Sequence, residues 1–295
     1  MRIIKTLLLG VLSVSAAVNA STQPPSATNQ WYWEHISDVK KAEIITLFSH
    51  GFGGDHAHGV FYGETGLLFP SRDRKSDFAV FDYPDAPAGL FGNKQSGLAQ
   101  KSEMERLDKA IENVRKHKKD LVLWGISCGA SNTVNVVGKH AAEGKSLDDV
   151  KALVLESPFG HSKDAVNQLA QNLGWNGGMS PWIVRWFLPE YCETSNIPAE
   201  WAKHIPSDMP ILLICTKKDT IVPAESTKKI YQSLKATGHE HVYLFEATQG
   251  AHCNIFADKN YLPVLHAFYK KYNLSHDESC ADAGQALLAQ CQPSA

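Results

Sequence analysis

Six apolar runs recur along the chain, and most of them lack a regular alternation of apolar and polar positions. A strand that is apolar on both faces is typical of a sheet that helices cover on both sides. These runs predict strands over residues 43–50, 77–83, 120–125, 151–157, 209–216 and 241–247.

Between the predicted strands, apolar residues recur at the spacing of an amphipathic helix. One apolar stripe lies among charged residues and consists of Met104, Leu107, Ile111 and Val114. Three more segments predict helices, the first two ending at a glycine: 130–144, 224–238 and 260–272. This alternation predicts an α/β fold with a doubly wound, mostly parallel sheet. Ligands of such sheets bind at the carboxyl ends of the strands.

The segment between the predicted strands at 151–157 and 209–216 is too long for a simple crossover, and it is rich in aromatic residues. We predict a small helical cap at about 158–206, over one end of the sheet. Its aromatic side chains are candidates to line a substrate pocket, namely Trp182, Trp186 and Phe187. The alternative for each of them is a place in the core without contact to a ligand.

The chain of 295 residues, of which 43% are hydrophobic, is long enough to bury one large core. No charged or Pro/Ser-rich linker divides its middle. We therefore predict one α/β domain over 44–275, preceded by an extension over 21–43. A C-terminal tail follows over 276–295.

The N-terminal residues resemble a cleavable secretory signal. Arg2 and Lys5 precede an uncharged apolar stretch, and small residues follow it up to Ala20. A signal peptide over 1–20 predicts a secreted or periplasmic protein whose mature form has no membrane span. The alternative is a retained anchor, for which the apolar stretch is short.

The predicted secreted or periplasmic location permits disulfides among the six cysteines, because disulfides persist in oxidising compartments. Cys280 and Cys291 bracket a short helix-like segment, and we predict that their disulfide pins the C-terminal tail. Sequence alone cannot fix such a pairing. Cys215 lies in a predicted strand, where a buried thiol is the ordinary case. Cys192 is expected to be free.

The stretch "GISCG", Gly125 to Gly129, follows a predicted strand and precedes a predicted helix. A serine at such a sharp turn leaves no room for side chains two residues to either side, so both positions need glycine. We predict that Ser127 is a nucleophile. The alternative is a serine that caps the following helix. Cys128 lacks glycines at the same offsets and is therefore not the expected nucleophile.

A serine hydroxyl needs a base to take its proton, and the base needs an acid to orient it. Asp219 and His252 each come just after a predicted strand, and with Ser127 they form the chain order Ser, Asp, His. The alternatives are a carboxylate that caps the helix beginning near Pro223 and a buried histidine without catalytic role.

Two backbone N–H groups are candidates for an oxyanion hole. The turn "HGFGGD" offers that of Phe52, and Cys128 offers its own at the start of a helix. His50 is expected to be a structural hydrogen-bonding residue. The nearby Asp55, His56 and His58 could suggest a metal site, but no further ligand set completes it, so we expect no metal and polar residues at a surface or pocket rim.

From about Ile44 to Tyr272, the chain resembles the α/β-hydrolase superfamily through "HGFGGD", "GISCGA", "LESPF", "KKDTIVP" and "GAHCN". The segment "PWIVRWFLPEYCETSNIPAEWAKHI" and "LESPF" resemble the compact-cap branch with acylglycerol hydrolases and protein depalmitoylases. The resemblance implies a serine hydrolase without cofactor that acts on an ester or thioester.

We accordingly predict a serine hydrolase that cleaves carboxylic esters, or thioesters, through an acyl-enzyme intermediate. The alternatives are a serine peptidase and a non-catalytic binding protein with the same fold. The expected partner is a small-molecule or lipid acyl ester. Nucleic acid is not expected, because 29 Lys and Arg against 31 Asp and Glu leave a net charge of −2. The oligomeric state stays open.

Overall fold

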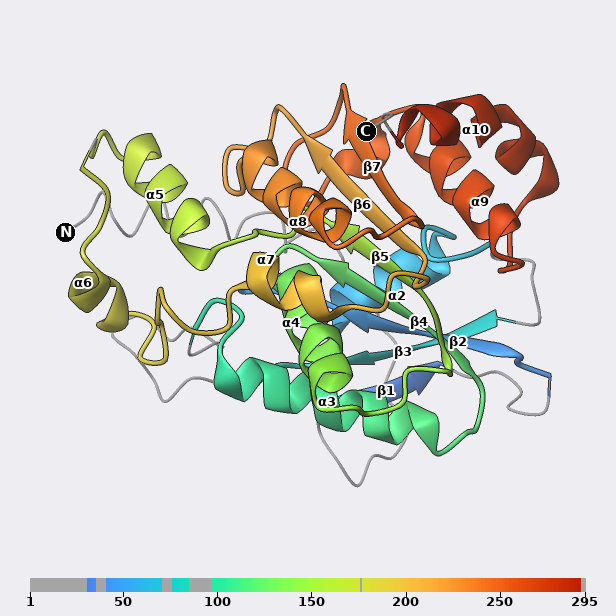
Figure 1. Ribbon diagram of the computed structural model, residues 1–295, viewed down its shortest axis with the longest axis horizontal. Coiled ribbons are helices and arrows are strands. Elements are labelled where there is room, and N and C mark those ends of the chain that lie inside the picture. Colours follow the sequence, from blue (N-terminus) through green and yellow to red (C-terminus); the bar gives the residue numbers. More distant parts are fainter. Residues whose placement is uncertain (1–30, 36–40, 71–75, 85–96, 176, 293–295) are drawn as a thin grey trace.

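The structure is a computed structural model that describes residues 31–35, 41–70, 76–84, 97–175 and 177–292. Among these residues, seven strands form one sheet in the order β1-β3-β2-β4-β5-β6-β7 (Figure 1). Strand β1 pairs antiparallel with β3, and every other pair is parallel. The strands are β1 Tyr32–His35, β2 Ile44–Ser49, β3 Ser76–Phe81, β4 Asp120–Ile126, β5 Val150–Glu156, β6 Ile211–Thr216 and β7 Val242–Ala247.

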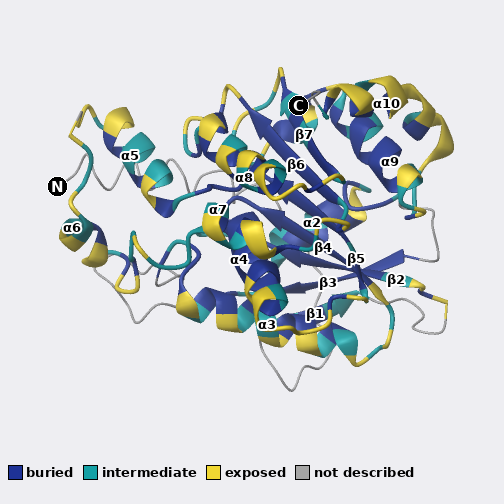
Figure 2. Ribbon diagram, in the orientation of Figure 1, coloured by how far each residue is buried: buried dark blue, intermediate teal, exposed yellow. Residues whose placement is uncertain are grey.

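Helices cover both faces of the sheet, as the continuous apolar strands predict. In β4, Leu121 and Leu123 join the core cluster on one face, while Val122 and Trp124 join the cluster on the other. Figure 2 shows the central strands buried and the outer faces of the helices exposed. One face carries α3 Lys101–Arg115, α4 Cys128–Ala142 and α8 Ala224–Ala236; the other carries α2 His56–Glu64, α9 Tyr261–Lys271 and α10 Glu278–Gln290.

The prediction of a doubly wound, mostly parallel sheet is thus confirmed, and all six predicted strands are present within one or two residues. Strand β1 was not predicted. It is only four residues long and pairs from Tyr32 opposite Phe81 to His35 opposite Phe78 at the edge of the sheet. So short a run gives little periodic signal.

Helix α2 was also not predicted, because its glycines are poor helix formers. A Cβ on Gly59 would lie 2.5 Å from Val80 Cγ1, and one on Gly63 would lie 2.4 Å from Phe78 Cε1. The glycines therefore let α2 pack directly onto β3. Asp55 begins the helix by accepting a hydrogen bond from the Ala57 N–H at 3.0 Å.

The segment between β5 and β6 contains short helices and lies at one end of the sheet (Figure 1). Its elements are α5 Ser162–Asn172, α6 Pro181–Arg185, α7 Pro198–Trp201 and the 3-10 helix η2 Ala202–His204. This segment corresponds to the predicted cap. Its role as a cap, like the other predicted domain boundaries, stays a prediction.

The predicted disulfide between Cys280 and Cys291 is wrong. All six cysteines lie among the described residues, and none of them forms a disulfide. Cys280 lies near the beginning of α10 and Cys291 caps its end, so one straight helix separates their Cα atoms by about 16 Å. A disulfide needs Cα atoms within about 7 Å. Cys215 is buried, as predicted.

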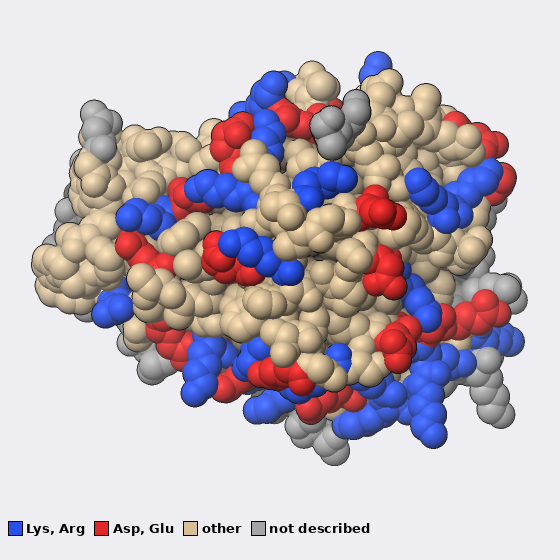
Figure 3. All heavy atoms as spheres, in the orientation of Figure 1, with Lys and Arg blue, Asp and Glu red and all other residues tan. Residues whose placement is uncertain are grey.

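The predicted signal peptide over 1–20 and much of the predicted extension over 21–43 lie outside the described residues. Within the described ranges, no helix combines the length and the apolar character that a membrane span requires. Figure 3 shows Lys and Arg side chains interspersed with Asp and Glu over one face of the molecule. The expectation that nucleic acid is not a partner stays a prediction.

Helix α10 packs against α9 through a contact that only glycine permits. A Cβ on Gly284 would lie 1.8 Å from the carbonyl oxygen of Pro263. We expect Gly284→Ala to lower the free energy of unfolding by about 1–3 kcal/mol, although alanine is the better helix former. Thermal or urea unfolding measures this effect. Gly177→Ala is the control, because nothing lies within 4 Å of its Cβ; equal stability of the two variants would contradict the packing.

Candidate active site

Ser127 occupies a strained turn between β4 and α4. Its φ of 55° and ψ of −120° lie in a region that side-chain-bearing residues rarely adopt. A Cβ on Gly125 would lie 2.6 Å from Ala130 Cα, and one on Gly129 would lie 2.1 Å from the Ser49 carbonyl oxygen. Both glycines are therefore required by close backbone contacts, as the G-x-S-x-G pattern predicts.

The side chains of Ser127, His252 and Asp219 form one chain of hydrogen-bonding contacts. His252 Nε2 lies 2.9 Å from Ser127 Oγ, and His252 Nδ1 lies 2.7 Å from Asp219 Oδ2. Ser127 makes no side-chain cap to α4, which removes the alternative reading of this residue as a helix cap. The three residues predicted as nucleophile, acid and base thus meet at the carboxyl ends of β4, β6 and β7.

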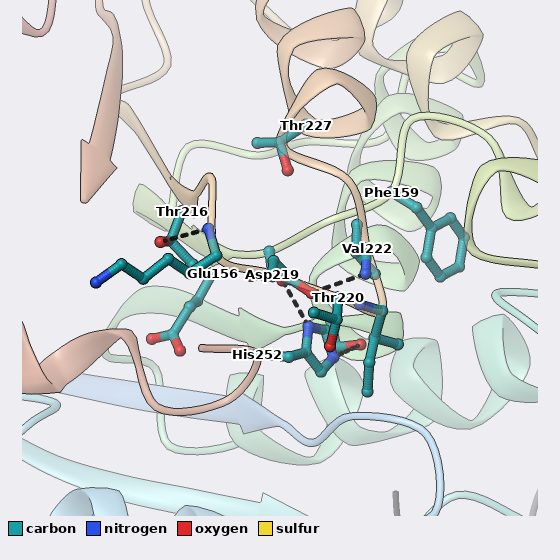
Figure 4. A network of polar contacts seen from close by, with 12 residues as sticks. Glu156, Phe159, Thr216, Asp219, Thr220, Val222, Thr227 and His252 are labelled. Atoms are coloured by element: carbon teal, nitrogen blue, oxygen red, sulfur yellow. Dashed lines mark hydrogen bonds and ion pairs between the residues drawn. The ribbon is translucent and has the colours of Figure 1, made fainter. Parts of the chain in front are cut away.

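The Asp219 carboxylate is held on several sides, and its side chain is 1% exposed. Oδ1 accepts the N–H groups of Ile221 at 2.9 Å and Val222 at 2.8 Å. Oδ2 accepts the hydroxyl of Ser157 at 2.9 Å in addition to the contact with His252. Figure 4 shows Asp219 between His252 and Val222. Asp219 therefore also holds the turn before α8, but it does not cap the helix, whose N-cap is Pro223.

His252 is nearly buried, with 11% of its side chain exposed. Burial lowers the pKa of His252, whereas its interactions with Cys253 and Asp219 raise it, and the balance lies well above the ordinary value. In the neutral form of His252, Nδ1–H donates to Asp219 and Nε2 is left to accept the Ser127 proton. This arrangement can convert the hydroxyl into a nucleophile.

The turn that carries Phe52 borders Ser127. A Cβ on Gly51 would lie 3.3 Å from Ser127 Cβ and 3.8 Å from its Oγ. His50 fixes this turn from behind: its Nδ1–H donates to the Gly51 carbonyl oxygen at 2.8 Å, and its Nε2 accepts the Tyr83 N–H at 3.3 Å. Burial lowers the pKa of His50 to about 4, so it stays neutral and structural. The oxyanion roles of the Phe52 and Cys128 N–H groups stay predictions.

The cap segment packs next to this turn. Phe52 contacts a cluster with Cys128, beside Ser127, and Val222, beside the Asp219 turn, and it also contacts a cluster formed by the cap. Phe187 packs against that cap cluster. Apolar contacts thus connect the cap to both sides of the triad-like arrangement.

Trp182 and Trp186 lie on the outside of the cap. Their side chains are 57% and 68% exposed, and their rings pack edge to face with centroids 5.3 Å apart. The predicted role of these two residues and Phe187 in a substrate pocket therefore remains a prediction.

Two of the three residues weighed as metal ligands, Asp55 and His56, have contacts within the fold. Asp55 caps α2, and His56 lies 3.0 Å from Asp82 Oδ2 and stacks on Trp33. His58 lies two residues further along α2. Within the part of the chain that the structure describes, no group of three or more His, Cys, Asp or Glu side chains is arranged to hold a metal ion.

Two residues of the site were not predicted: Glu156, the last residue of β5, and Ser157, which follows it. The Glu156 carbonyl oxygen accepts the Ser127 N–H at 2.7 Å, and the Ser157 hydroxyl binds Asp219. The position of "ES" directly after a buried apolar run was a usable signal, because the carboxyl ends of parallel strands meet at one edge of the sheet.

No family model matches the chain. The uncharacterized protein YfhR of Escherichia coli (strain K12) is 27% identical over 214 residues. This match covers 70% of the chain, which spans 64% of the length of YfhR.

Several solved structures resemble the chain in fold. Acylaminoacyl peptidase of Pyrococcus horikoshii aligns with 87% of the chain and 42% of its own length, at 16% identity and a TM-score of 0.57. A mutant of the esterase rPPE aligns with 97% of the chain and 89% of its own, at 16% identity and a TM-score of 0.55. Esterase Pf2001 of Pyrococcus furiosus aligns with 85% of the chain and 99% of its own length, at 15% identity and a TM-score of 0.55. The chain has the α/β-hydrolase fold, as its motifs predict.

The close backbone contact at Gly129 makes a test of the strained turn. We expect Gly129→Ala to lower the free energy of unfolding by about 3 kcal/mol, because the added methyl group would overlap the Ser49 carbonyl oxygen. Ala130→Gly, one residue further in α4, is the control and should cost about 1 kcal/mol. Urea unfolding followed by circular dichroism compares them. A smaller effect at Gly129 than at Ala130 would refute the contact.

Proposed function

We propose that the protein is a serine hydrolase that cleaves carboxylic ester or thioester bonds through an acyl-enzyme intermediate. The observation that carries this proposal is the contact chain from Ser127 through His252 to the buried Asp219. Residues so arranged activate a hydroxyl group, and each also follows a strand that ends at the same edge of the sheet.

In the proposed reaction, Ser127 Oγ attacks the acyl carbonyl carbon while His252 Nε2 takes the hydroxyl proton. Asp219 holds the resulting imidazolium through Nδ1–H, and the N–H groups of Phe52 and Cys128 bind the oxyanion. Each such donor contributes about 3 kcal/mol to the stability of the transition state. The imidazolium then gives its proton to the leaving alcohol or thiol as the bond to the acyl carbon breaks.

Water completes the cycle. His252 takes a proton from a water molecule, whose oxygen attacks the acyl carbon of the acyl-enzyme. When the second tetrahedral intermediate collapses, His252 returns the proton to Ser127 Oγ and the carboxylic acid leaves. Ser127, His252 and the water molecule account for every proton in this cycle, and the proposal includes no cofactor.

An ester substrate is favoured by the apolar surroundings of the turn at Phe52, where the cap cluster and the cluster at Cys128 meet. Such surroundings suit an acyl chain, including that of a lipid, and the resemblance to the compact-cap branch agrees with this. The fold is shared by esterases and by acylaminoacyl peptidases, so a peptidase is the second candidate. We further propose action outside the cytoplasm, on the basis of the signal-like residues 1–20.

A fluorophosphonate probe tests the nucleophile, because it reacts with activated serine hydroxyls. We expect wild-type protein to be labelled and Ser127→Ala to be unlabelled and to lose on the order of 10⁶-fold in kcat. Ser131→Ala is a matched control, since Ser131 is a buried serine of α4 whose hydroxyl contacts backbone carbonyl oxygens. An unlabelled wild type that is fully folded would favour the non-catalytic binding protein.

A substrate panel separates esterase from peptidase. We expect p-nitrophenyl esters of graded chain length to be hydrolysed with a maximum at one acyl length, and aminoacyl p-nitroanilides to be hydrolysed at least about 100-fold more slowly, a difference of about 2.7 kcal/mol. The measurement is kcat/KM for each compound. The reverse order would replace the proposed esterase with a peptidase.

A further inference from the structure

Glu156 is a buried carboxyl group that the proposed reaction does not use. It ends β5 and is 0% exposed. Two tyrosine hydroxyls donate to it, that of Tyr261 to Oε2 at 2.9 Å and that of Tyr62 to Oε1 at 3.4 Å. An ionised carboxylate only accepts hydrogen bonds, so a pair of hydroxyl donors matches its charged form.

The residues at the end of β5 contact both Ser127 and Asp219, the first and last members of the proposed triad. The Glu156 carbonyl oxygen accepts the Ser127 N–H at 2.7 Å, and the next residue, Ser157, donates its hydroxyl to Asp219. Figure 4 shows Glu156 in one cluster with Asp219 and His252. The backbone at the end of β5 thus contacts the nucleophile, while Tyr62 and Tyr261 hold the Glu156 carboxyl group beside the site.

We propose that Glu156 is a positioning residue of this site: its carboxylate, held by Tyr62 and Tyr261, supplies a second negative charge that favours the protonated form of His252. This inference rests on the proposed function. In the proposed reaction the imidazolium forms as the bond to the acyl carbon forms, so a fixed negative charge nearby stabilises the transition state more than the resting state.

The titration of Glu156 supports this role. Burial raises its pKa to about 7, although the Tyr261 hydroxyl, the charge of His252 and the Tyr62 hydroxyl each lower it, while Asp219 raises it. These groups come from α9, α2 and the loops after β6 and β7, and Cys253, next to His252, also acts on Tyr62 and His252. Glu156 is therefore ionised above neutral pH and becomes neutral below it.

The two titrations influence each other. A proton on Glu156 removes negative charge and weakens the affinity of His252 for its own proton. Activity requires neutral His252 and falls as the pH falls through the pKa of His252. Because each proton disfavours the other, the acid limb of the profile of kcat/KM against pH should be broader than that of a single group.

Glu156→Gln keeps the shape and removes the charge. We expect the midpoint of the acid limb to move to lower pH by about one unit, the limb to narrow to a single titration, and kcat on the plateau to fall about tenfold. In an NMR titration of the resting protein, the midpoint of the His252 imidazole titration should move to lower pH by the same amount. A midpoint that stays at the wild-type pH would overturn the proposal, whatever happens to kcat.

Tyrosine variants keep the test valid if Glu156→Gln does not fold. Tyr62→Phe and Tyr261→Phe each remove a donor that stabilises the carboxylate, so each should lower the His252 midpoint, by less than Glu156→Gln does. Tyr269→Phe is the matched control: its buried hydroxyl, also on α9, donates to the Leu68 carbonyl oxygen at 2.8 Å and should leave the midpoint unchanged. Equal midpoints in all three variants would contradict the role of Glu156.

The two proposals fail in distinguishable ways. If wild-type protein is not labelled by the fluorophosphonate probe, the proposed function fails, whereas the NMR titration of His252 still measures the effect of Glu156. If labelling occurs and the midpoint does not move, only the role of Glu156 fails.

Discussion

The geometry of the site depends on the turn at Ser127, where the chain passes from β4 to α4 with a backbone strain that isolated peptides avoid. The strain persists because the turn is enclosed. Gly129 lies against the end of β2, and the Ser127 N–H is bound by the end of β5. Neighbouring strands thus fix the direction of the serine side chain before any catalytic partner is considered.

Parallel pairing then brings together residues that are far apart in sequence. Strands β2, β4, β5, β6 and β7 all end at one edge. The strand ends and the loops after them supply the turn at Phe52, Ser127, the Glu156–Ser157 pair, Asp219 and His252. The backbone hydrogen bonds of the sheet set the distances between these loops. The contacts of 2.7 and 2.9 Å at His252 are therefore a consequence of sheet register as much as of side-chain chemistry.

The sequence predicts those parts of the structure whose signal is local. Six strands and the serine turn have such signals, because burial on both faces forces apolar runs and the strained turn forces glycines. Strand β1 and helix α2 lack them: β1 acquires its conformation from pairing with β3, and α2 contains glycines that its contact with β3 requires. The predicted disulfide failed because spacing in sequence does not show that one helix keeps its ends apart.

The hydrogen-bond donors around the two buried acids, Asp219 and Glu156, differ in number and in kind. Asp219 accepts four hydrogen bonds, two from backbone N–H groups, one from Ser157 and one from His252. Glu156 accepts two, one of them long, from hydroxyl groups alone. In a buried environment, each missing donor leaves the charge of a carboxylate less compensated. The charge of Glu156 is therefore less compensated by hydrogen bonds than that of Asp219. Asp219 contacts the imidazole of His252 directly, whereas the role proposed for Glu156 acts on the imidazole through charge alone.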